Sequence, residues 1–218
     1  MNQGKESIKD VFEKWAGGWT ASSMEWGHPI PHKWWLKKLD LAEDSKVLDM
    51  GCGTGWASRM VAKMVPNGEV VGIDFAEGMI QKAKQLISKD KAHNYRSLSF
   101  KIADVEAIPY PDNYFDRVIC VESFAWYPNP AAALREIKRV LKPEGKLYVA
   151  DMPDSRPLRF VLKVWKLFIP GLDKLNIYSE NEFREFLEAG FGNVYPKKAN
   201  WIFQFAGERV LLTVGTKK

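Results

Sequence analysis

Hydrophobic residues recur along this chain with two different spacings. Short apolar runs of strand length alternate with longer segments in which apolar residues return every three or four positions, the period of an α-helix. The strand-like runs begin at Val47 and continue with residues 69–74, 98–103, 118–121 and 146–151. The helix-like stripes lie at residues 56–65, 79–87 and 130–141. This alternation predicts an α/β fold of the doubly wound kind, a parallel sheet covered by helices on both faces.

The two ends of the chain extend this pattern. Apolar residues between positions 8 and 15 share one face of a short predicted helix. Residues 179–182 read Ser-Glu-Asn-Glu, a capping box that opens another helix. Two strand-like runs follow at residues 194–199 and 209–216, close enough to pair as antiparallel neighbours. We therefore expect an antiparallel pair at one edge of the sheet.

The composition is typical of one globular domain. A chain of 218 residues is long enough for a single well-packed core. Its two cysteines, Cys52 and Cys120, form neither a disulfide framework nor a metal-ligand set. The sequence has no secretory leader and no apolar stretch near the roughly 18 residues that span a bilayer, so we expect a cytoplasmic protein. The net charge of +5 is spread over most of the predicted helices, and nucleic acid is not an expected partner.

A glycine-rich segment follows the first predicted strand. It reads Asp49-Met50-Gly51-Cys52-Gly53-Thr54-Gly55, with a helical stripe directly after it. Glycines permit a tight turn and a close approach of the backbone to a ligand. An ordinary turn between a strand and a helix is the alternative. A nearby carboxylate suits a ligand with a positive charge better than it suits a pyrophosphate.

Carboxylates also follow the other strands of the predicted sheet. Asp74 ends the second strand, 19 residues after Gly55, close to the spacing of about 20 at which an acidic residue reaches a ribose. Asp104 follows the third strand and Glu122 follows the fourth. Any one of these acids could be a helix cap or a turn residue. Together with Asp49 they are expected to gather where the parallel strands end, which is where ligands bind in such folds.

The spacing of the glycine segment resembles motif I of the class I methyltransferases, which use S-adenosylmethionine and release S-adenosylhomocysteine. The resemblance implies a Rossmann-like sheet of seven strands, mostly parallel, with an antiparallel hairpin at the edge. It also implies that Gly51 to Gly55 wraps the methionine end of the cofactor and that Asp74 binds the ribose hydroxyls. Phe75 and Met79 would then lie beside the adenine, and Asp104, Val105 and Glu106 would read its amino group.

Other segments narrow this resemblance. Residues 108–122 and 141–145 look like the type 11 branch, which acts on small molecules, although Glu144-Gly145 replaces the usual Gly-Gly. Residues 11–16 and 32–35 are loosely similar to the opening of the ubiquinone and menaquinone C-methyltransferases. We therefore expect a small, partly apolar acceptor, and the quinone assignment is an alternative. The atom that accepts the methyl group is not defined by these residues.

Aromatic residues and one histidine are candidates for further contacts. Trp19 is our candidate for a cation-π contact with the sulfonium of the cofactor. His28 is a candidate base at the substrate, and Trp126 and Tyr127 are candidate substrate contacts, with a surface loop and simple packing as the alternatives. Trp165 lies in a segment, residues 158–169, whose apolar arc is wider than one sheet face needs. That arc could wall the acceptor pocket, touch a membrane surface, be buried in the core or form a homodimer contact.

These observations define one domain over residues 1–218. We expect an N-terminal helical lid (1–44), a cofactor-binding core (45–151), a helical insertion over the substrate site (152–178) and a closing helix with edge strands (179–218). The spacing of His, Cys, Asp and Glu predicts no metal site, and no catalytic residue is assigned. An NAD-dependent oxidoreductase and a non-catalytic cofactor-binding protein are the competing classes. The glycine spacing argues against the first, and the acids at the strand ends argue against the second.

Overall fold

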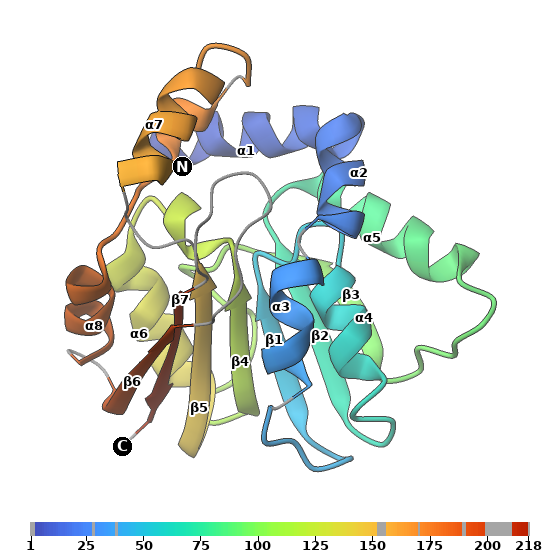
Figure 1. Ribbon diagram of the computed structural model, residues 1–218. Coiled ribbons are helices and arrows are strands. Elements are labelled where there is room, and N and C mark those ends of the chain that lie inside the picture. The colour runs from blue at the N-terminus through green and yellow to red at the C-terminus, as the bar shows by residue number, and fades with distance from the viewer. Residues whose placement is uncertain are drawn as a thin grey trace.

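A computed structural model of the protein describes residues 3–27, 29–37, 39–151, 156–169, 171–188, 191–198 and 211–217 (Figure 1). The strands are β1 (Lys46–Met50), β2 (Glu69–Asp74), β3 (Leu98–Ile102), β4 (Phe115–Val121), β5 (Leu141–Asp151), β6 (Gly192–Lys198) and β7 (Leu211–Thr216). The helices are α1 (Gln3–Ala16), α2 (Trp19–Trp26), α3 (Pro29–Leu36), α4 (Trp56–Ala62), α5 (Glu77–Lys89), α6 (Pro130–Val140), α7 (Arg156–Trp165) and α8 (Glu180–Glu188). Two short 3₁₀ turns are η1 (Phe124–Trp126) and η2 (Leu172–Lys174).

The strands form one mixed sheet in the order β3-β2-β1-β4-β5-β7-β6. The pairs β3·β2, β2·β1, β1·β4 and β4·β5 are parallel, whereas β5·β7 and β7·β6 are antiparallel. The order reverses at β1, whose neighbours are β2 on one side and β4 on the other. Ligands bind at such a switch point, outside the carboxyl ends of the strands. The predicted Rossmann-like α/β fold, mostly parallel with an antiparallel edge pair, is confirmed.

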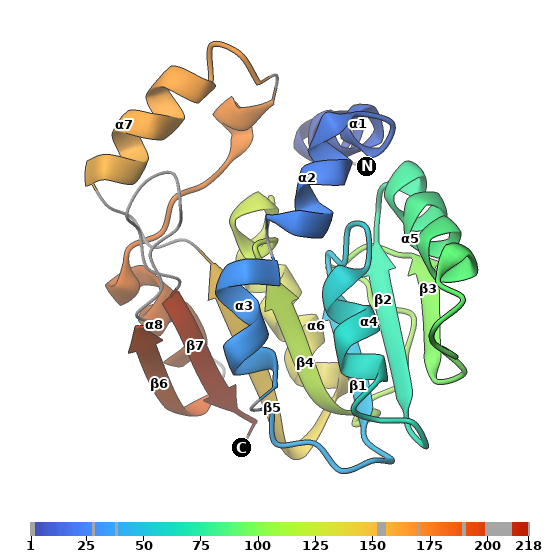
Figure 2. The same cartoon turned by 45° about the vertical axis from the view of Figure 1, so that its right-hand side comes forward.

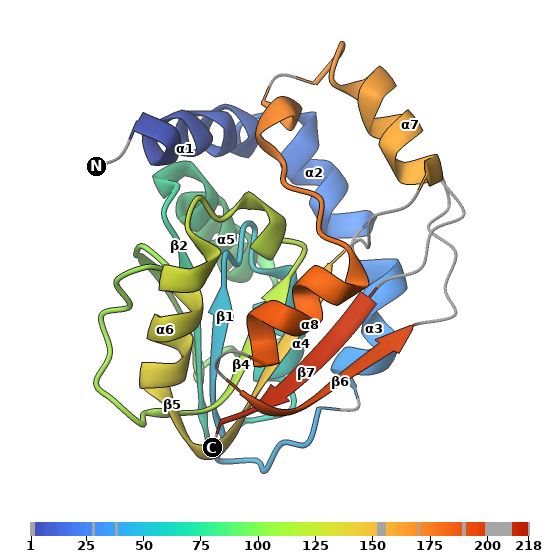
Figure 3. The ribbon, with the colours of Figure 1, turned by 90° about the vertical axis from the view of Figure 1, so that its left-hand side faces the viewer.

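Helices cover both faces of the sheet because side chains on successive strand residues point to opposite sides. Val47 of β1 packs in a buried cluster with residues of α3, α4 and α5. Leu48 and Met50 pack in a second buried cluster with residues of α6 and α8. Figure 3 shows α6 and α8 on this second face. The two-sided burial makes β1 apolar after its first residue, Lys46, except at Asp49, which is buried near the carboxyl end of the strand.

The N-terminal helices lie across the carboxyl ends of the parallel strands. Figure 2 shows α1 and α2 above these ends, with α7 beside them. Glu13 of α1 caps the N-terminus of α5, since its two carboxylate oxygens accept hydrogen bonds from the backbone N–H groups of Glu77 (2.6 Å) and Gly78 (2.8 Å). A carboxylate is favourable there because a helix N-terminus presents unpaired N–H groups and a partial positive charge. This cap fixes α1 over the edge of the sheet.

Several boundaries differ from the sequence prediction, among them the start of the fifth strand. We expected this strand to begin at Lys146, but β5 begins at Leu141. Leu141 pairs with Phe115 across an irregular step in the β4·β5 register. Glu144, in the left-handed region with a φ of 59°, donates its N–H to the carbonyl of Lys217 (3.0 Å). Lys217, directly after β7, therefore holds the first part of β5 in place. The capping box at residues 179–182 is present as predicted, with reciprocal bonds between Ser179 and Glu182.

None of the helices in the described parts of the chain is both long and apolar enough to cross a membrane.

Candidate functional site

The glycine segment forms a loop between β1 and α4. Gly51, Gly53 and Gly55 all adopt positive φ values, 64°, 52° and 78°. The loop is held by backbone bonds, from Cys52 N–H to the carbonyl of Ile73 (2.9 Å) and from Gly55 N–H to the carbonyl of Cys52 (2.8 Å). These backbone conformations are costly for residues with a side chain, so the loop needs glycine at all three positions.

Gly51 lies against a buried polar network. A Cβ at Gly51 would come within 2.6 Å of the Cβ of Ser123. The hydroxyl of Ser123 donates to the carbonyl of Met50 (2.7 Å), and the Tyr127 hydroxyl lies 3.2 Å from the same carbonyl. The network ties the end of β1 to the segment after β4. Burial raises the pKa of Tyr127 well above its ordinary value, so this hydroxyl stays protonated and serves as a donor.

Gly51→Ala is expected to lower the free energy of unfolding by about 2–4 kcal/mol, because it combines a strained φ with an overpacked contact. Cofactor binding should weaken as well, since the loop must move to relieve the clash. Gly17→Ala is the matched control, because a Cβ at Gly17 meets nothing within 4 Å. Urea unfolding and calorimetric titration measure the two effects. Equal stability of the two variants would contradict this account of the loop.

Asp74 connects the end of β2 to the glycine loop. Its Oδ2 accepts a hydrogen bond from Gly53 N–H (3.0 Å) and its Oδ1 accepts one from Ala76 N–H (2.9 Å). Burial raises the pKa of this carboxyl to about 6, although the backbone bonds oppose the shift. Asp74 is therefore ionised at neutral pH and lies at the wall of a cavity, where a diol could donate to it.

Asp49 lies behind the loop and does not line the cavity. It is fully buried and accepts a hydrogen bond from the Ser58 hydroxyl (2.5 Å) at the start of α4. Burial raises its pKa to about 7, the Ser58 bonds oppose this, and the nearby charge of Asp74 adds to it. The residue couples β1 to α4 beneath the glycine loop.

A lysine from α1 reaches the segment after β3. The Lys5 ammonium lies 2.7 Å from Asp104 and 2.6 Å from Glu106. Partial burial alone would lower the pKa of Lys5, but the hydrogen bonds to the two carboxylates raise it above its ordinary value. Asp104 also accepts a bond from the N–H of Glu106 (2.9 Å), which shapes the turn. The N-terminal helix is thus attached by charge at Lys5 as well as at Glu13.

A cavity lies between these elements and is partly open to solvent, with about 750 Å³ of empty space when the part open to solvent is included. Of the predicted site residues, it is lined by Gly51, Cys52, Gly53, Asp74, Phe75, Asp104, Val105, Glu122, Trp126 and Tyr127. The sequence did not single out the remaining lining residues, which are Lys5, Phe12, Met24, Thr54, Trp56, Val121, Ser123 and Pro128. The hydroxyl of Thr54 is buried and has no hydrogen-bond partner among the described residues, as expected of a group that a ligand satisfies.

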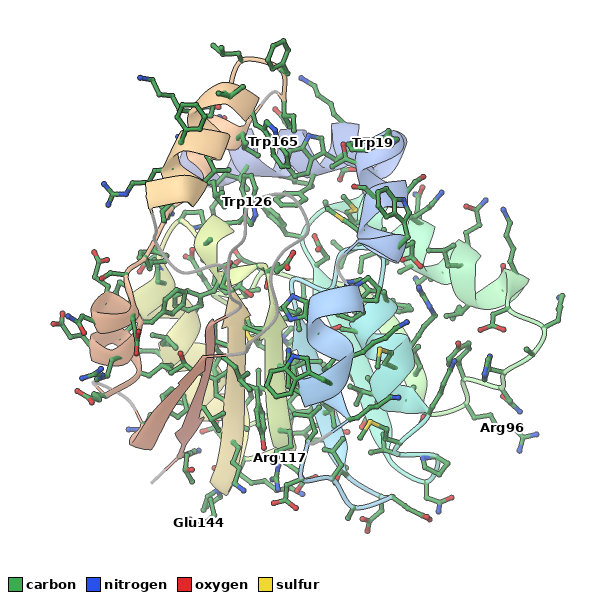
Figure 4. All side chains as sticks on the ribbon, viewed as in Figure 1. Trp19, Arg96, Arg117, Trp126, Glu144 and Trp165 are labelled. Atoms are coloured by element: carbon green, nitrogen blue, oxygen red, sulfur yellow. The ribbon has the colours of Figure 1, made fainter. Side chains whose placement is uncertain are left out.

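Several predicted site residues do not line this cavity. Trp19 is 71% exposed at the start of α2, apart from Trp126 in Figure 4. Trp19 therefore does not line this cavity, to which α2 contributes Met24 instead. Trp165 is 40% exposed on α7. His28 lies outside the described residues.

The other predicted residues that miss the cavity support it from behind. Met79 is fully buried in a small cluster with Ala16 and Ala76. Gly55 is required by packing, since a Cβ there would lie 2.3 Å from the ring of Phe100. Met50 contributes its carbonyl to the network described above, and Glu106 binds Lys5. Asp49, as noted, bonds to Ser58.

Aromatic rings from distant segments meet over the cavity. Phe12 of α1 contacts Trp126 edge to face, with ring centroids 5.1 Å apart, and its ring lies 6.3 Å from Phe75. Trp15 contacts Trp126 in a similar way at 5.4 Å. Such a roof excludes water and presents aromatic faces, which attract a sulfonium cation. The stripe at residues 8–15 contained this signal, but periodicity alone did not show which ring would reach the cavity.

The glycine loop lies at the switch point of a Rossmann-like sheet. Asp74, at the spacing of an acid that binds a ribose, ends β2, and Asp104 follows β3. This arrangement defines a class of enzymes that bind a nucleoside cofactor. The model of a family described as a methyltransferase domain matches residues 41–207, and the chain belongs to this family. It is an S-adenosylmethionine-dependent methyltransferase. The glycine loop, Asp74 and the unsatisfied Thr54 hydroxyl fit that cofactor.

Individual relatives agree with the family assignment. The chain is 28% identical over 217 residues to a protein of Staphylococcus saprophyticus named demethylmenaquinone methyltransferase, a match that covers 93% of this chain and 88% of the relative. A putative methyltransferase of Haloferax volcanii, solved in complex with the Trm112 methyltransferase activator, is similar with a TM-score of 0.76 and 26% identity, covering 94% and 97% of the two chains. A SAM-dependent methyltransferase from Aquifex aeolicus has a TM-score of 0.67 and 25% identity, covering 96% and 98%.

Proposed function

We propose that this enzyme methylates a small, partly apolar acceptor, of the chemical class of a hydroxylated aromatic ring that carries an apolar tail. In this proposal α1 and α2, which belong to the N-terminal segment expected to form a lid (residues 1–44), cover the cofactor, and α7 borders the acceptor. The relatives named demethylmenaquinone methyltransferase support a quinone precursor as the acceptor. A cytoplasmic location and a homodimer stay predictions.

The proposal rests on the large apolar side chains that are exposed on the outer face of α7 and in the turn after it. Phe160, Leu167 and Phe168 are between 70% and 79% exposed, and Val164 lies between them at 39%. Residues 160 and 164 share one face of α7, four residues apart, and residues 167 and 168 follow in the turn after the helix. Monomeric proteins rarely expose so many large apolar side chains together, and such a patch marks an interaction site.

The opposite face of α7 connects this patch to the cavity. Leu162 is buried and packs with Leu172 in a cluster that includes Trp15 and Trp126. Trp126 also lines the cavity. An apolar tail that leaves the cavity past Trp126 would therefore meet α7 next, and the outer face of the helix would meet whatever surface holds that tail.

Basic residues lie beside the apolar face. Arg159, Lys163 and Lys166 each precede one of the apolar residues, so they form a stripe at the same helical spacing. They also line a groove with Leu175 and residues 176–177. An apolar face flanked by cations is suited to the surface of an anionic membrane, where the side chains insert and the cations meet lipid headgroups. We propose that α7 docks there to collect the acceptor.

In this scheme the bound cofactor supplies an electrophilic methyl group. The chain contributes binding and orientation through the glycine loop and Asp74, and the aromatic roof excludes water. Holding the donor and the acceptor aligned contributes an effective gain on the order of 7–11 kcal/mol in such reactions. The first test is transfer of labelled methyl to two naphthoquinols that share a ring and differ only in an isoprenoid tail. Methylation of the tailed acceptor with a higher kcat/KM supports the proposal, and turnover of neither acceptor by cofactor-saturated enzyme would refute it.

Replacing Phe160, Leu167 and Phe168 by Ser is expected to abolish flotation with phosphatidylglycerol vesicles at low salt, because the inserted apolar area is lost. The charge variant Lys163→Glu/Lys166→Glu should weaken flotation by at least tenfold, given about 1 kcal/mol per basic residue. Lys84→Glu/Lys89→Glu on α5 is the matched control with the same change of net charge, and it should float like the parent. Failure of the parent protein to float would remove the membrane contact and leave the small-molecule acceptor intact.

A further inference from the structure

A buried histidine is bonded to the acid at the end of β4. His32 of α3 is fully buried, and its Nε2 lies 2.7 Å from Oε1 of Glu122. The indole N–H of Trp35, one helical turn away, donates to Nδ1 of the same ring (3.0 Å). Glu122 lines the cavity. A chain of hydrogen bonds therefore runs from the helix α3 to the wall of the site.

The bond from Trp35 fixes the protonation state of the histidine ring. An indole N–H only donates, so Nδ1 must present its lone pair. The neutral ring then carries its proton on Nε2, and that N–H donates to the Glu122 carboxylate. His32 in this arrangement donates to Glu122 and gives its carboxylate a fixed orientation.

The backbone of Glu122 is independently unusual. Its φ is 52°, in the left-handed region that residues with a side chain seldom occupy. Its N–H bonds to the carbonyl of Ala150 (2.7 Å), which anchors it to β5. Strained backbone of this kind persists where the surrounding structure dictates it, and it concentrates at functional sites. Here it turns the residue after β4 toward the cavity.

The strand order separates Glu122 from the other carboxylates that line the cavity. Asp104 follows β3 and Asp74 ends β2, whereas Glu122 follows β4 on the far side of the glycine loop. Glu122 is thus the lining carboxylate at the glycine-loop end, where the family resemblance places the methionine part of the cofactor. His32 lies 5.8 Å, ring to ring, from Trp56, which lines the same end.

We propose that His32 is a positioning residue that holds Glu122 as an oriented carboxylate facing the sulfonium of S-adenosylmethionine, so that the site favours this cofactor over its product, whose sulfur carries no charge. S-adenosylhomocysteine lacks the sulfonium charge, so an attraction to that charge is lost once the methyl group has left. Because the attraction exists before the reaction, it tightens the binding of the cofactor relative to that of the product. It does not accelerate the chemical step. The inference depends on the cofactor and is independent of the acceptor proposed above.

The test is the ratio of the dissociation constants of S-adenosylhomocysteine and S-adenosylmethionine, measured by calorimetric titration. Glu122→Gln should lower this ratio by about tenfold, the effect of removing one charge interaction in a partly screened site. His32→Leu should lower it in the same direction. His32→Gln should restore most of it, since an amide N–H can replace Nε2. Asp104→Asn is the matched control in the same cavity and should leave the ratio unchanged.

A purely structural role for His32 would weaken both ligands equally and leave the ratio at the value of the parent, which would overturn the proposal. An unchanged ratio in Glu122→Gln would overturn it as well. Trp35→Phe keeps a ring of similar size and removes only the N–H that fixes the imidazole, so it tests the same point if His32→Leu does not fold. Its ratio should fall. Turnover adds a second measure, because Glu122→Gln should raise the KM for the cofactor more than it lowers kcat.

Discussion

Asp74→Asn should weaken the binding of S-adenosylmethionine by about 100-fold. The Asp74 carboxylate accepts N–H bonds from Gly53 and Ala76, and the family resemblance gives it the ribose hydroxyls as well. An amide of the same shape presents an N–H where an acceptor is needed, so a buried donor is left unsatisfied and the glycine loop loses its anchor. Removing one partner from a buried charged hydrogen bond typically costs about 2–5 kcal/mol.

Calorimetric titration with S-adenosylmethionine and S-adenosylhomocysteine measures this loss, with NAD as a ligand that should not bind. Asp116→Asn is the matched control. Asp116 lies at the opposite end of β4, where it accepts from Lys142 (2.6 Å) and from the N–H of Lys46 (2.8 Å). Its substitution should leave both dissociation constants unchanged. Undiminished binding by Asp74→Asn would mean that the ribose is held elsewhere.

The core of the fold was predictable because local pattern and tertiary environment agree there. The predicted bounds of β2 coincide with the observed ones, since a buried parallel strand is apolar on both faces and ends where a polar residue meets the ligand edge. The same logic located Asp74, Asp104 and Glu122 at one edge of the sheet. The capping box at Ser179 was predictable for a related reason, because its two reciprocal bonds lie within four residues.

The residues that cover the cavity and those that support Glu122 depend on contacts between segments far apart in the sequence. Lys5 reaches Asp104 across 99 positions, and His32 reaches Glu122 across 90. No periodicity within α1 or α3 records such a partner. On α2, which is only eight residues long, the sequence favoured Trp19 for its aromatic face, whereas packing directs Met24 to the cavity. The acidic residues at the strand ends could thus be predicted from the local sequence. The residues that cover the cavity could be identified only from the packing of the helices in the structure.

Asp49→Asn should raise the free energy of unfolding by about 4 kcal/mol at pH 8. The folded protein raises the pKa of Asp49 from 3.8 to about 7 because burial disfavours its charge, so the folded state binds a proton that the unfolded state has released. Between these two values each pH unit costs the parent protein about 1.4 kcal/mol relative to the variant, and above the folded pKa the full difference persists. The gain of the variant should therefore shrink as the pH falls and vanish near pH 4. Asparagine can still accept the Ser58 hydroxyl, so little is lost in exchange.

Urea unfolding of both proteins between pH 5 and pH 8 gives the difference directly. Asp116→Asn should instead be less stable than the parent by a constant amount over this range, because burial opposes but the Lys142 ion pair prevails in lowering the pKa of Asp116. Its loss of stability should diminish only as the pH falls below the ordinary carboxyl value of 3.8, where Asp116 of the parent protein becomes protonated as well. A loss of stability in Asp49→Asn that is independent of pH would instead show that Asp49 is held mainly by its hydrogen bond. If Asp49→Asn is more stable than the parent but binds the cofactor more weakly, then the buried carboxylate beneath the glycine loop lowers stability and is needed for cofactor binding.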